Sequence, residues 1–431
     1  MQQATPVTTT LNPDQQAALD SILAWLDDPY AGSEYVLAGY AGTGKTFTVR
    51  KLIEVFKGRI VFTAPTNKAT KVLRATLKAA NYTPECRTIY SLLGLKLEAN
   101  GEVKELKVPE DPIDLSQFRL IVVDEGSMLN STVLAYLRDL VSDHKGLRVL
   151  YMGDHAQLPP VGERESPIWT IENKSSLTKV MRHDNQILNL ATAIRKLVDH
   201  PAPNLTGLIK TDKDEHGGVE VINSALMTSR IWAAAHSGEL TKGTTKVIAW
   251  RNATVDRYNA MARQAIFGDE AGRSFWLPGD RLIFTEPAKD FNDEIVATVD
   301  DEGLVEKVIE EYHPIHGSVK CYRITVQIDQ GPLVVAYAVH PAGRAEFARI
   351  TESLAQDARS MPRKWKDFWL FKEAFHSVRH AYAITAHRSQ GSTYTTVLGD
   401  YKDVLVNRTR HEALRCFYVM CTRPTTSLVL A

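Results

Sequence analysis

Eight residues near the N-terminus have the types and spacing of a phosphate-binding loop. An apolar segment typical of a strand precedes them and a helical pattern follows them, and their sequence is Gly39-Tyr40-Ala41-Gly42-Thr43-Gly44-Lys45-Thr46. Glycines let backbone N–H groups surround phosphates, and a helix N-terminus adds partial positive charge. The ammonium group of Lys45 would reach the β- and γ-phosphates, and the Thr46 hydroxyl would bind Mg²⁺. The sequence therefore predicts a site for a nucleoside triphosphate.

Two acidic residues close a later apolar segment, residues 120–123. At the end of a strand, Asp124 suits a second ligand of Mg²⁺, and Glu125 suits polarisation of an attacking water. An acidic pair in this position is also common in an ordinary turn, but its place one or two strand–helix units after the phosphate loop favours the catalytic interpretation. Gln157 follows the next predicted strand, where its amide can hydrogen-bond a γ-phosphate.

Three further segments indicate that the chain does more than hydrolyse a nucleotide. Pro65, Thr66 and Asn67 end the strand after the phosphate loop and offer small hydrogen-bonding groups to a sugar–phosphate backbone. A similar segment, residues 385–391, follows a strand near the C-terminus. Arg423 ends the last predicted helix, where an arginine from a second domain can contact a γ-phosphate. Alone, Arg423 would be read as a surface ion-pair residue.

Short β-branched segments alternate with helical patterns on both sides of the chain's middle, which is typical of parallel sheets in an α/β fold. The first set has strands at residues 35–38, 60–64, 120–123 and 149–152, and helices at 47–56, 68–80 and 131–141. The second set has helices at 185–198, 253–267 and 411–421, and strands at 246–249, 382–385, 396–399 and 427–430. Between the two parts of the second set, residues 281–285, 304–309, 322–328 and 333–339 predict a small inserted β-barrel.

Composition fits this multidomain α/β protein and excludes several other classes. A chain of 431 residues with 44% hydrophobic and 24% charged residues is neither disordered nor collagenous. Four scattered cysteines favour neither a disulfide framework nor zinc, and suggest a reducing compartment. We expect no secretory signal and no membrane span, hence a cytoplasmic location in a bacterial or phage-infected cell.

The formal net charge is zero, from 51 basic and 51 acidic residues, but the charges are unevenly distributed. Lys and Arg outnumber Asp and Glu by 13 to 5 over residues 45–107 and by 11 to 5 over residues 361–423. Over residues 281–313 the acidic residues prevail by 10 to 3. Two basic regions can form a local track for a polyanion, although ordinary solvated faces would give the same counts.

In this order, the motifs resemble those of superfamily 1 DNA helicases, in the branch that contains RecD and the Dda helicases of T-even phages. The resemblance extends from Leu11 to about Leu430. It implies that Gln15 reads the adenine base, that Gln390 and Gly391 also contact the nucleotide, and that Arg182 in Leu177-Thr178-Lys179-Val180-Met181-Arg182 is a second γ-phosphate arginine. For single-stranded DNA, it implies contacts from Pro65, Thr66, Asn67, Tyr90, Thr385 and His387. The chain departs from the usual pattern at Gly126, Tyr90, Arg388 and Pro424.

The same resemblance implies two RecA-like P-loop domains with two insertions. The first domain would comprise residues 1–87 and 112–174, with a β-hairpin pin at 88–111. The second would comprise residues 175–272 and 376–431, with an SH3-like β-barrel and helical subdomain at 273–375. ATP would bind in the cleft between the two domains. Its hydrolysis would drive movement of the protein along single-stranded DNA in the 5′→3′ direction. Forked duplex DNA would be the substrate, for a monomer that can work beside a single-strand-binding protein.

The hairpin is also readable from the residues themselves. Leu95, Leu97, Leu106 and Val108 alternate with polar residues around Asn100-Gly101, a strong turn signal. We expect its tip, which comprises Glu98, Ala99, Asn100, Gly101, Glu102 and Val103, to separate the strands. A surface hairpin without a function is the equally plausible alternative.

An aromatic segment, residues 364–371, offers either a stacking surface for bases or a packing face. Trp365, Phe368 and Trp369 share one helical face, which favours packing between the inserted barrel and the second α/β domain.

Two other functions share parts of this pattern. A kinase would use the phosphate loop but would not need Gln157 or Arg182. A translocase that moves along nucleic acid without unwinding it would need every motif except the hairpin, and RNA could replace DNA as its track.

Overall fold

The computed structural model describes residues 10–79, 82–111, 113–179, 186–200, 205 and 207–431. The chain forms two compact units, and one short segment from the first half of the chain belongs to the second unit. Unit 1 comprises Met1–Gly94 and Pro109–Asn204, and unit 2 comprises Leu95–Val108 and Leu205–Ala431. Each unit is described by itself. Within the described residues, we find no helix with both the length and the apolar character needed to cross a bilayer.

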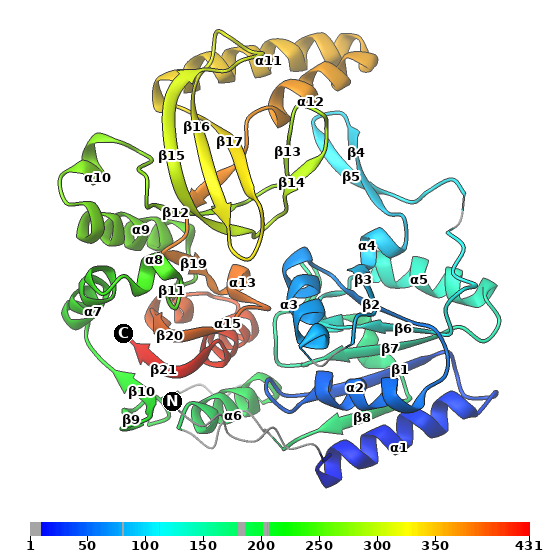
Figure 1. The fold of residues 1–431 in the computed structure, drawn as a ribbon. Helices are drawn as coiled ribbons and strands as arrows, with labels where there is room; N and C mark the ends of the chain where they lie inside the picture. The colour runs from blue at the N-terminus through cyan, green and yellow to red at the C-terminus, as the bar shows by residue number, and fades with distance from the viewer. Residues whose placement is uncertain (1–9, 80–81, 112, 180–185, 201–204, 206) are drawn as a thin grey trace. The chain divides into compact units, whose positions relative to one another are not determined.

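Unit 1 contains a six-stranded sheet in which every pair of neighbours is parallel (Figure 1). The strand order is β3 (Glu85–Thr88), β2 (Ile60–Ala64), β6 (Leu120–Val123), β7 (Arg148–Gly153), β1 (Glu34–Gly39) and β8 (Lys174–Leu177). All residues of β2 and β6 are buried, as expected for central strands whose two faces are both covered. The helices are α1 (Pro13–Asp27), α2 (Lys45–Val55), α3 (Asn67–Lys78), α4 (Ile89–Leu92), α5 (Ser131–Asp143) and α6 (Gln186–Asp199).

Unit 2 contains a second six-stranded sheet, which is parallel except for its edge strand β9. Its order is β19 (Ala383–Thr385), β11 (Thr245–Ala249), β20 (Tyr394–Gly399), β21 (Pro424–Leu430), β10 (Gly217–Val221) and β9 (Asp212–Asp214). Its helices are α7 (Ser224–His236), α8 (Glu239–Lys242), α9 (Asn252–Phe267), α10 (Glu270–Arg273), α13 (Ala386–Ser389), α14 (Tyr401–Leu405) and α15 (Arg410–Thr422). Both predicted parallel α/β sheets are therefore present.

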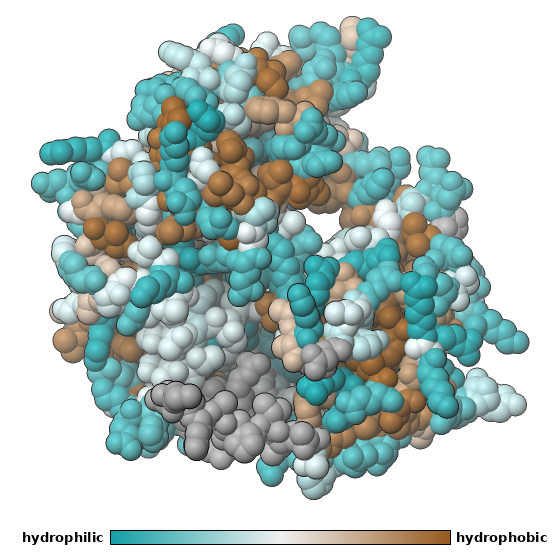
Figure 2. Space-filling model, in the orientation of Figure 1, coloured by the Kyte–Doolittle hydropathy of each residue, from teal (hydrophilic) through white to brown (hydrophobic). Residues whose placement is uncertain are grey.

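The segment between α10 and β19 forms a five-stranded antiparallel sheet and two helices. The sheet order is β17 (Leu333–Val339), β16 (Lys320–Ile328), β15 (Glu302–Tyr312), β12 (Arg281–Phe284) and β18 (Val378–His380). A small hairpin, β13 (Ala288–Lys289) and β14 (Ile295–Ala297), accompanies it, and the helices are α11 (Arg344–Ser360) and α12 (Trp365–Glu373). Figure 2 shows hydrophobic surface on this insertion, where Leu333, Val335 and Ile295 are exposed.

Residues 95–108 form the predicted antiparallel hairpin, and their contacts assign it to unit 2. Strands β4 (Lys96–Asn100) and β5 (Val103–Lys107) pair so that Asn100 lies opposite Val103. The turn is therefore Gly101-Glu102, and the prediction of Asn100-Gly101 as the turn is wrong by one residue. Gly101 has a φ of 65°. Two-residue hairpin turns are usually of type I′, as in Asn-Gly, or of type II′, which has glycine at its first position. Both types have a backbone twist that matches the twist of the strands.

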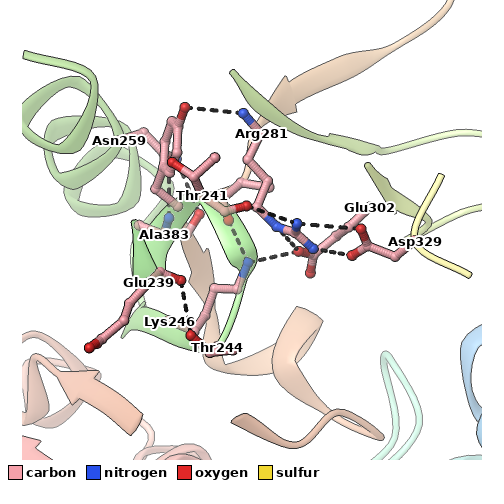
Figure 3. Close-up of polar contacts among 11 residues, drawn as sticks. Glu239, Thr241, Thr244, Lys246, Asn259, Arg281, Glu302, Asp329 and Ala383 are labelled. Carbon is pink, nitrogen blue, oxygen red and sulfur yellow. Dashed lines mark hydrogen bonds and ion pairs between the residues drawn. The ribbon is translucent and has the colours of Figure 1, made fainter. Parts of the chain in front are cut away.

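A buried ion pair, which a second cation extends, attaches the inserted sheet to the second parallel sheet (Figure 3). Lys246 of β11 is fully buried, and its Nζ lies 2.7 Å from Glu302 Oε2 of β15. Arg281 of β12 donates from Nε to the same Glu302 oxygen at 3.1 Å and also pairs with Asp329. Lys246 additionally donates to the carbonyl of Ala381, and Arg281 Nη1 to that of Thr241. These contacts fix the orientation of the insertion within unit 2.

Removal of one cation from this set should destabilise unit 2 strongly. In Lys246→Met, Glu302 keeps Arg281 but loses its second cation in a buried site, and we expect a loss of about 3 kcal/mol in the free energy of unfolding. The matched control is Lys213→Met, because the Lys213–Glu220 pair is half-exposed and its loss should cost less than about 1 kcal/mol. Chemical denaturation of both variants measures the difference. Equal losses would contradict the structural role of the buried pair.

Candidate nucleotide site and nucleic-acid contacts

The phosphate loop joins β1 to α2 in a conformation that requires glycine at two positions. Gly42 and Gly44 have φ values of 81° and 83°. Lys45 begins α2, and its Nζ donates to the carbonyls of Gly39 at 2.7 Å and Tyr40 at 3.2 Å. The Lys45 side chain therefore folds toward the first residues of the phosphate loop. The glycines, the helix N-terminus and the ammonium group together form a cradle suited to phosphate.

Gln15 ties helix α1 to this loop. Its backbone N–H bonds Asn12 Oδ1 at 2.9 Å, and its Oε1 accepts from the N–H of Asn12 at 3.1 Å, so the two residues form a capping box. Its Nε2 donates to the carbonyl of Thr43 at 3.0 Å, and the side chain is only 2% exposed. A Cβ at Gly44 would lie 2.4 Å from Gln15 Nε2, so any larger residue there would displace the Gln15 amide. The structure therefore places Gln15 beside the phosphate loop.

Asp124 and Glu125 follow β6, which is two places from β1 in the sheet. The backbone N–H of Glu125 donates to Asp124 Oδ1 at 2.9 Å. Burial raises the pKa of Asp124, while the positive charge of Lys45 nearby lowers it. Glu125 has a φ of 49°, a strained backbone for a non-glycine residue, of the kind that occurs at functional sites. Thr46 and Asp124 provide the hard oxygen donors that suit Mg²⁺.

Asp154 connects the loop after β7 to the phosphate loop. Its carboxylate accepts from the backbone N–H of Ala41 at 3.0 Å and from that of Ala156 at 3.1 Å. Gln157 follows in the same turn, where its N–H donates to the Asp154 carbonyl at 3.0 Å, and its side chain is 4% exposed. Gln157 is predictable from its place after a strand, whereas Asp154 is not, because a carboxylate that bonds backbone amides has no spacing signature.

The predicted DNA-contacting residues of unit 1 lie at the carboxyl ends of β2 and β3. Pro65 is buried, Thr66 is partly buried and Asn67 is exposed. The Thr66 hydroxyl accepts from the N–H of Ala69 at 3.1 Å and therefore caps α3. Tyr90 is partly buried in α4, and burial raises its pKa. Asn67 is the side chain of this group most open to a ligand.

The corresponding residues of unit 2 surround the short helix α13. The Thr385 hydroxyl caps α13 by accepting from the N–H of Arg388 at 3.3 Å. His387 is 45% exposed and lies 3.5 Å from Glu412, and burial lowers its pKa, which favours the neutral ring. Gln390 and Gly391 end this segment, and Gly391 has a φ of 76°.

Arg423 is held within unit 2 by its own neighbours. Its Nη1 donates to the carbonyl of Ser392 at 3.1 Å, its Nη2 to Thr422 Oγ1 at 3.0 Å, and its Nε to the carbonyl of Val419 at 3.2 Å. The residue is 5% exposed, so the interpretation as a surface ion-pair residue is wrong. Arg182, the other predicted γ-phosphate arginine, lies outside the described residues.

The aromatic segment packs partly as predicted and partly elsewhere. Phe368 and Phe371 are buried, and Phe371 belongs to the core between α12 and the inserted sheet. Trp369, however, donates from Nε1 to the carbonyl of Gly101 at 3.0 Å, and Trp365 lies beside the same glycine. The prediction that Trp365 and Trp369 pack between the inserted barrel and the second α/β domain is therefore wrong. They contact the hairpin, because the fold brings a segment from more than 250 residues upstream onto α12.

Comparisons with known proteins agree with this arrangement. A model of the AAA domain family matches residues 10–223, and a model of the UvrD-like helicase C-terminal domain matches residues 380–431. The ATP-dependent DNA helicase Dda of Enterobacteria phage T4 is 25% identical and aligns with 82% of this chain and 84% of Dda. The uncharacterized protein R530 of Acanthamoeba polyphaga mimivirus is 25% identical over 97% of this chain and 99% of its own.

Solved structures show the same fold. Bacteroides Pif1 bound to single-stranded DNA matches 98% of this chain and 92% of its own, with a TM-score of 0.51 and 17% identity. A structure of two coordinating Pif1 helicases at forked double-stranded DNA gives a TM-score of 0.53 at 16% identity, over 98% of this chain and 92% of the matched one.

Proposed function

Since the chain belongs to the superfamily 1 helicases of the Pif1 and Dda type, we propose that it is an ATP-dependent DNA helicase that unwinds duplex DNA. The observation that supports the proposal most is the phosphate loop of unit 1, with Lys45, Asp124 and Gln15 around it. Dda and Pif1 are named as ATP-dependent DNA helicases, and solved Pif1 structures hold single-stranded or forked DNA.

In the proposed reaction, each side chain around the loop has one task. Lys45 would leave the carbonyls of Gly39 and Tyr40 and bind the β- and γ-phosphates, while Gln15 would contact adenine. Glu125 would orient and deprotonate the attacking water, and Gln157, Arg182 and Arg423 would bind the γ-phosphate. Thr46 and Asp124 would hold Mg²⁺, which supplies neutralisation of phosphate charge when it is bound.

We propose that DNA is contacted on both units at the carboxyl ends of parallel strands. Pro65, Thr66, Asn67 and Tyr90 would serve on unit 1, and Thr385 and His387 on unit 2. Backbone and stacking contacts tolerate any base sequence, so the enzyme would move along single-stranded DNA without reading it. Movement in the 5′→3′ direction is part of the proposal. So is the division into two RecA-like domains with a pin at 88–111 and an SH3-like barrel subdomain at 273–375.

The proposed pin gains rigidity from its contacts within unit 2. An isolated two-stranded hairpin is at best marginally stable in water. Here Arg359 Nε of α11 donates to Glu102 at 2.9 Å, and Lys104 pairs with Glu373 of α12. The Lys104 ammonium also lies 4.9 Å from the ring centroid of Trp369. These contacts hold the turn, while Leu97 and Val103 stay exposed at 62% and 57%. Exposed apolar side chains on a rigid hairpin are suited to act as a wedge against a base pair.

Lys45→Ala should abolish ATP hydrolysis, because the ammonium group supplies the positive charge for the phosphates. Binding of single-stranded DNA should remain measurable, since Lys45 lies in none of the proposed DNA contacts. The measurements are a steady-state ATPase assay with single-stranded DNA and fluorescence anisotropy with a labelled oligonucleotide. Full ATPase activity in Lys45→Ala would overturn the assignment of the phosphate loop.

Changes at the proposed pin should separate ATPase activity from unwinding. Replacement of residues 98–102 by a short turn should leave DNA-stimulated ATPase intact and abolish unwinding of a forked duplex. Trp369→Ala should reduce unwinding several-fold, because the turn loses a hydrogen bond and a cation–π contact worth about 1 kcal/mol each.

Leu370→Ala is the matched control on α12, since the Leu370 side chain is 56% exposed, and the hydrogen bonds and ion pair that hold the hairpin are made by Arg359, Trp369 and Glu373. Unwinding at the wild-type rate by the shortened hairpin would refute the pin and leave a translocase that separates strands by other means.

A further inference from the structure

Arg195 projects from α6 beside the phosphate loop. Helix α6 has one buried face, formed by Ile187, Leu190, Ala191, Ile194 and Val198. Arg195 is adjacent to this face, and its side chain is only 18% exposed. No role for Arg195 follows from the sequence, because one arginine in a helical pattern is usually an exposed charge.

The guanidinium of Arg195 contacts two residues that shape the loop. Its Cζ lies 3.5 Å from the ring centroid of Tyr40, the second residue of the loop, so the planar group stacks on the ring. Its Nε lies 3.7 Å from Asp154 Oδ1, which is ion-pair distance. That Nε is buried and has no hydrogen-bond acceptor among the described residues. A shortening of roughly 0.7 Å would convert the ion pair into a direct hydrogen bond.

Asp154 makes this contact relevant to the nucleotide. Its carboxylate is completely buried and holds the backbone N–H of Ala41 inside the phosphate loop. A cation beside a buried carboxylate offsets the cost of burying its charge, and a hydrogen bond to a charged acceptor is stronger than one to a neutral acceptor. Arg195 therefore acts on the loop in two ways, through the Tyr40 ring and through the charge of Asp154.

We propose that Arg195 is a positioning residue of the ATP site, which sets the geometry of the phosphate loop through Tyr40 and Asp154. The proposal rests on the proposed ATPase function of this loop. A preformed loop binds phosphate without a cost of ordering, so the loss of Arg195 should weaken nucleotide binding more than it slows the chemical step. Lysine should replace arginine poorly, because an ammonium group is not planar, cannot stack on the Tyr40 ring and has no rigid fork of donors.

The experiment compares Arg195→Met, Arg195→Lys and Tyr40→Leu with the wild type. Each variant should raise the KM for ATP about tenfold in the presence of single-stranded DNA, with kcat changed by less than about threefold. The double variant Tyr40→Leu/Arg195→Met should be no worse than Arg195→Met, because Arg195→Met already removes the stacking contact that Tyr40→Leu breaks. Lys196→Met is the matched control: it removes an exposed positive charge from the next position of α6 and should leave KM and kcat unchanged.

Two further readouts make the result decisive. Binding of a fluorescent ADP analogue should weaken in parallel with the rise in KM, and thermal unfolding should show that the variants are folded. An Arg195→Met protein with the KM of Lys196→Met, or one that loses thermal stability and kcat at constant KM, would overturn the positioning role. A wild-type protein that binds the ADP analogue but never hydrolyses ATP would instead refute the proposed function, and the binding comparison would still test Arg195.

Discussion

The arrangement of unit 2 depends on one carboxylate, Glu302, that two buried cations share. Lys246 of the second parallel sheet and Arg281 of the inserted sheet both bond one oxygen of Glu302. Such pairs need not stabilise a fold more than apolar packing would, but we infer that this one fixes the orientation of its partners. The inserted sheet packs on α12, and α12 holds the turn of the hairpin. A continuous series of contacts therefore connects β11 to the proposed pin.

This connection explains why the hairpin is assigned to unit 2 although its chain leaves and re-enters unit 1. The covalent attachment at residues 94–95 and 108–109 is to unit 1, whereas the Trp369, Arg359 and Glu373 contacts are to helices of unit 2. A pin held in this way would move with α11 and α12. In unit 1, the phosphate loop is constrained similarly from several sides, by Gln15, by Asp154 and by the glycines at positive φ.

Much of the fold and part of the site could be predicted from the sequence. Strands such as β2 and β6 are short, β-branched and fully buried, so their apolar runs were unambiguous. The phosphate loop was readable because its glycines and Lys45 are required within eight residues. Residue patterns did not predict helices α1 and α11 or strand β8. In α11 polar residues dilute the apolar face, and the few residues of β8 are mostly polar.

Contacts between distant segments could not be predicted. The spacing of Trp365, Phe368 and Trp369 correctly indicated one packing face, but not the hairpin as its partner. Asn100-Gly101 indicated a turn, yet the pairing of Asn100 with Val103 moved it by one residue. The bonds of Asp154 to Ala41 and of Lys246 to Glu302 depend on tertiary structure, and neither follows from residue type or spacing.

The central claim is that ATP hydrolysis drives strand separation at the hairpin. The most direct measurement is ATP-dependent unwinding of duplexes that carry a 5′ or a 3′ single-stranded tail, with the wild-type chain. We expect the 5′-tailed duplex to be unwound and the 3′-tailed duplex to remain intact. Hydrolysis of ATP on single-stranded DNA without unwinding of either duplex would contradict the account.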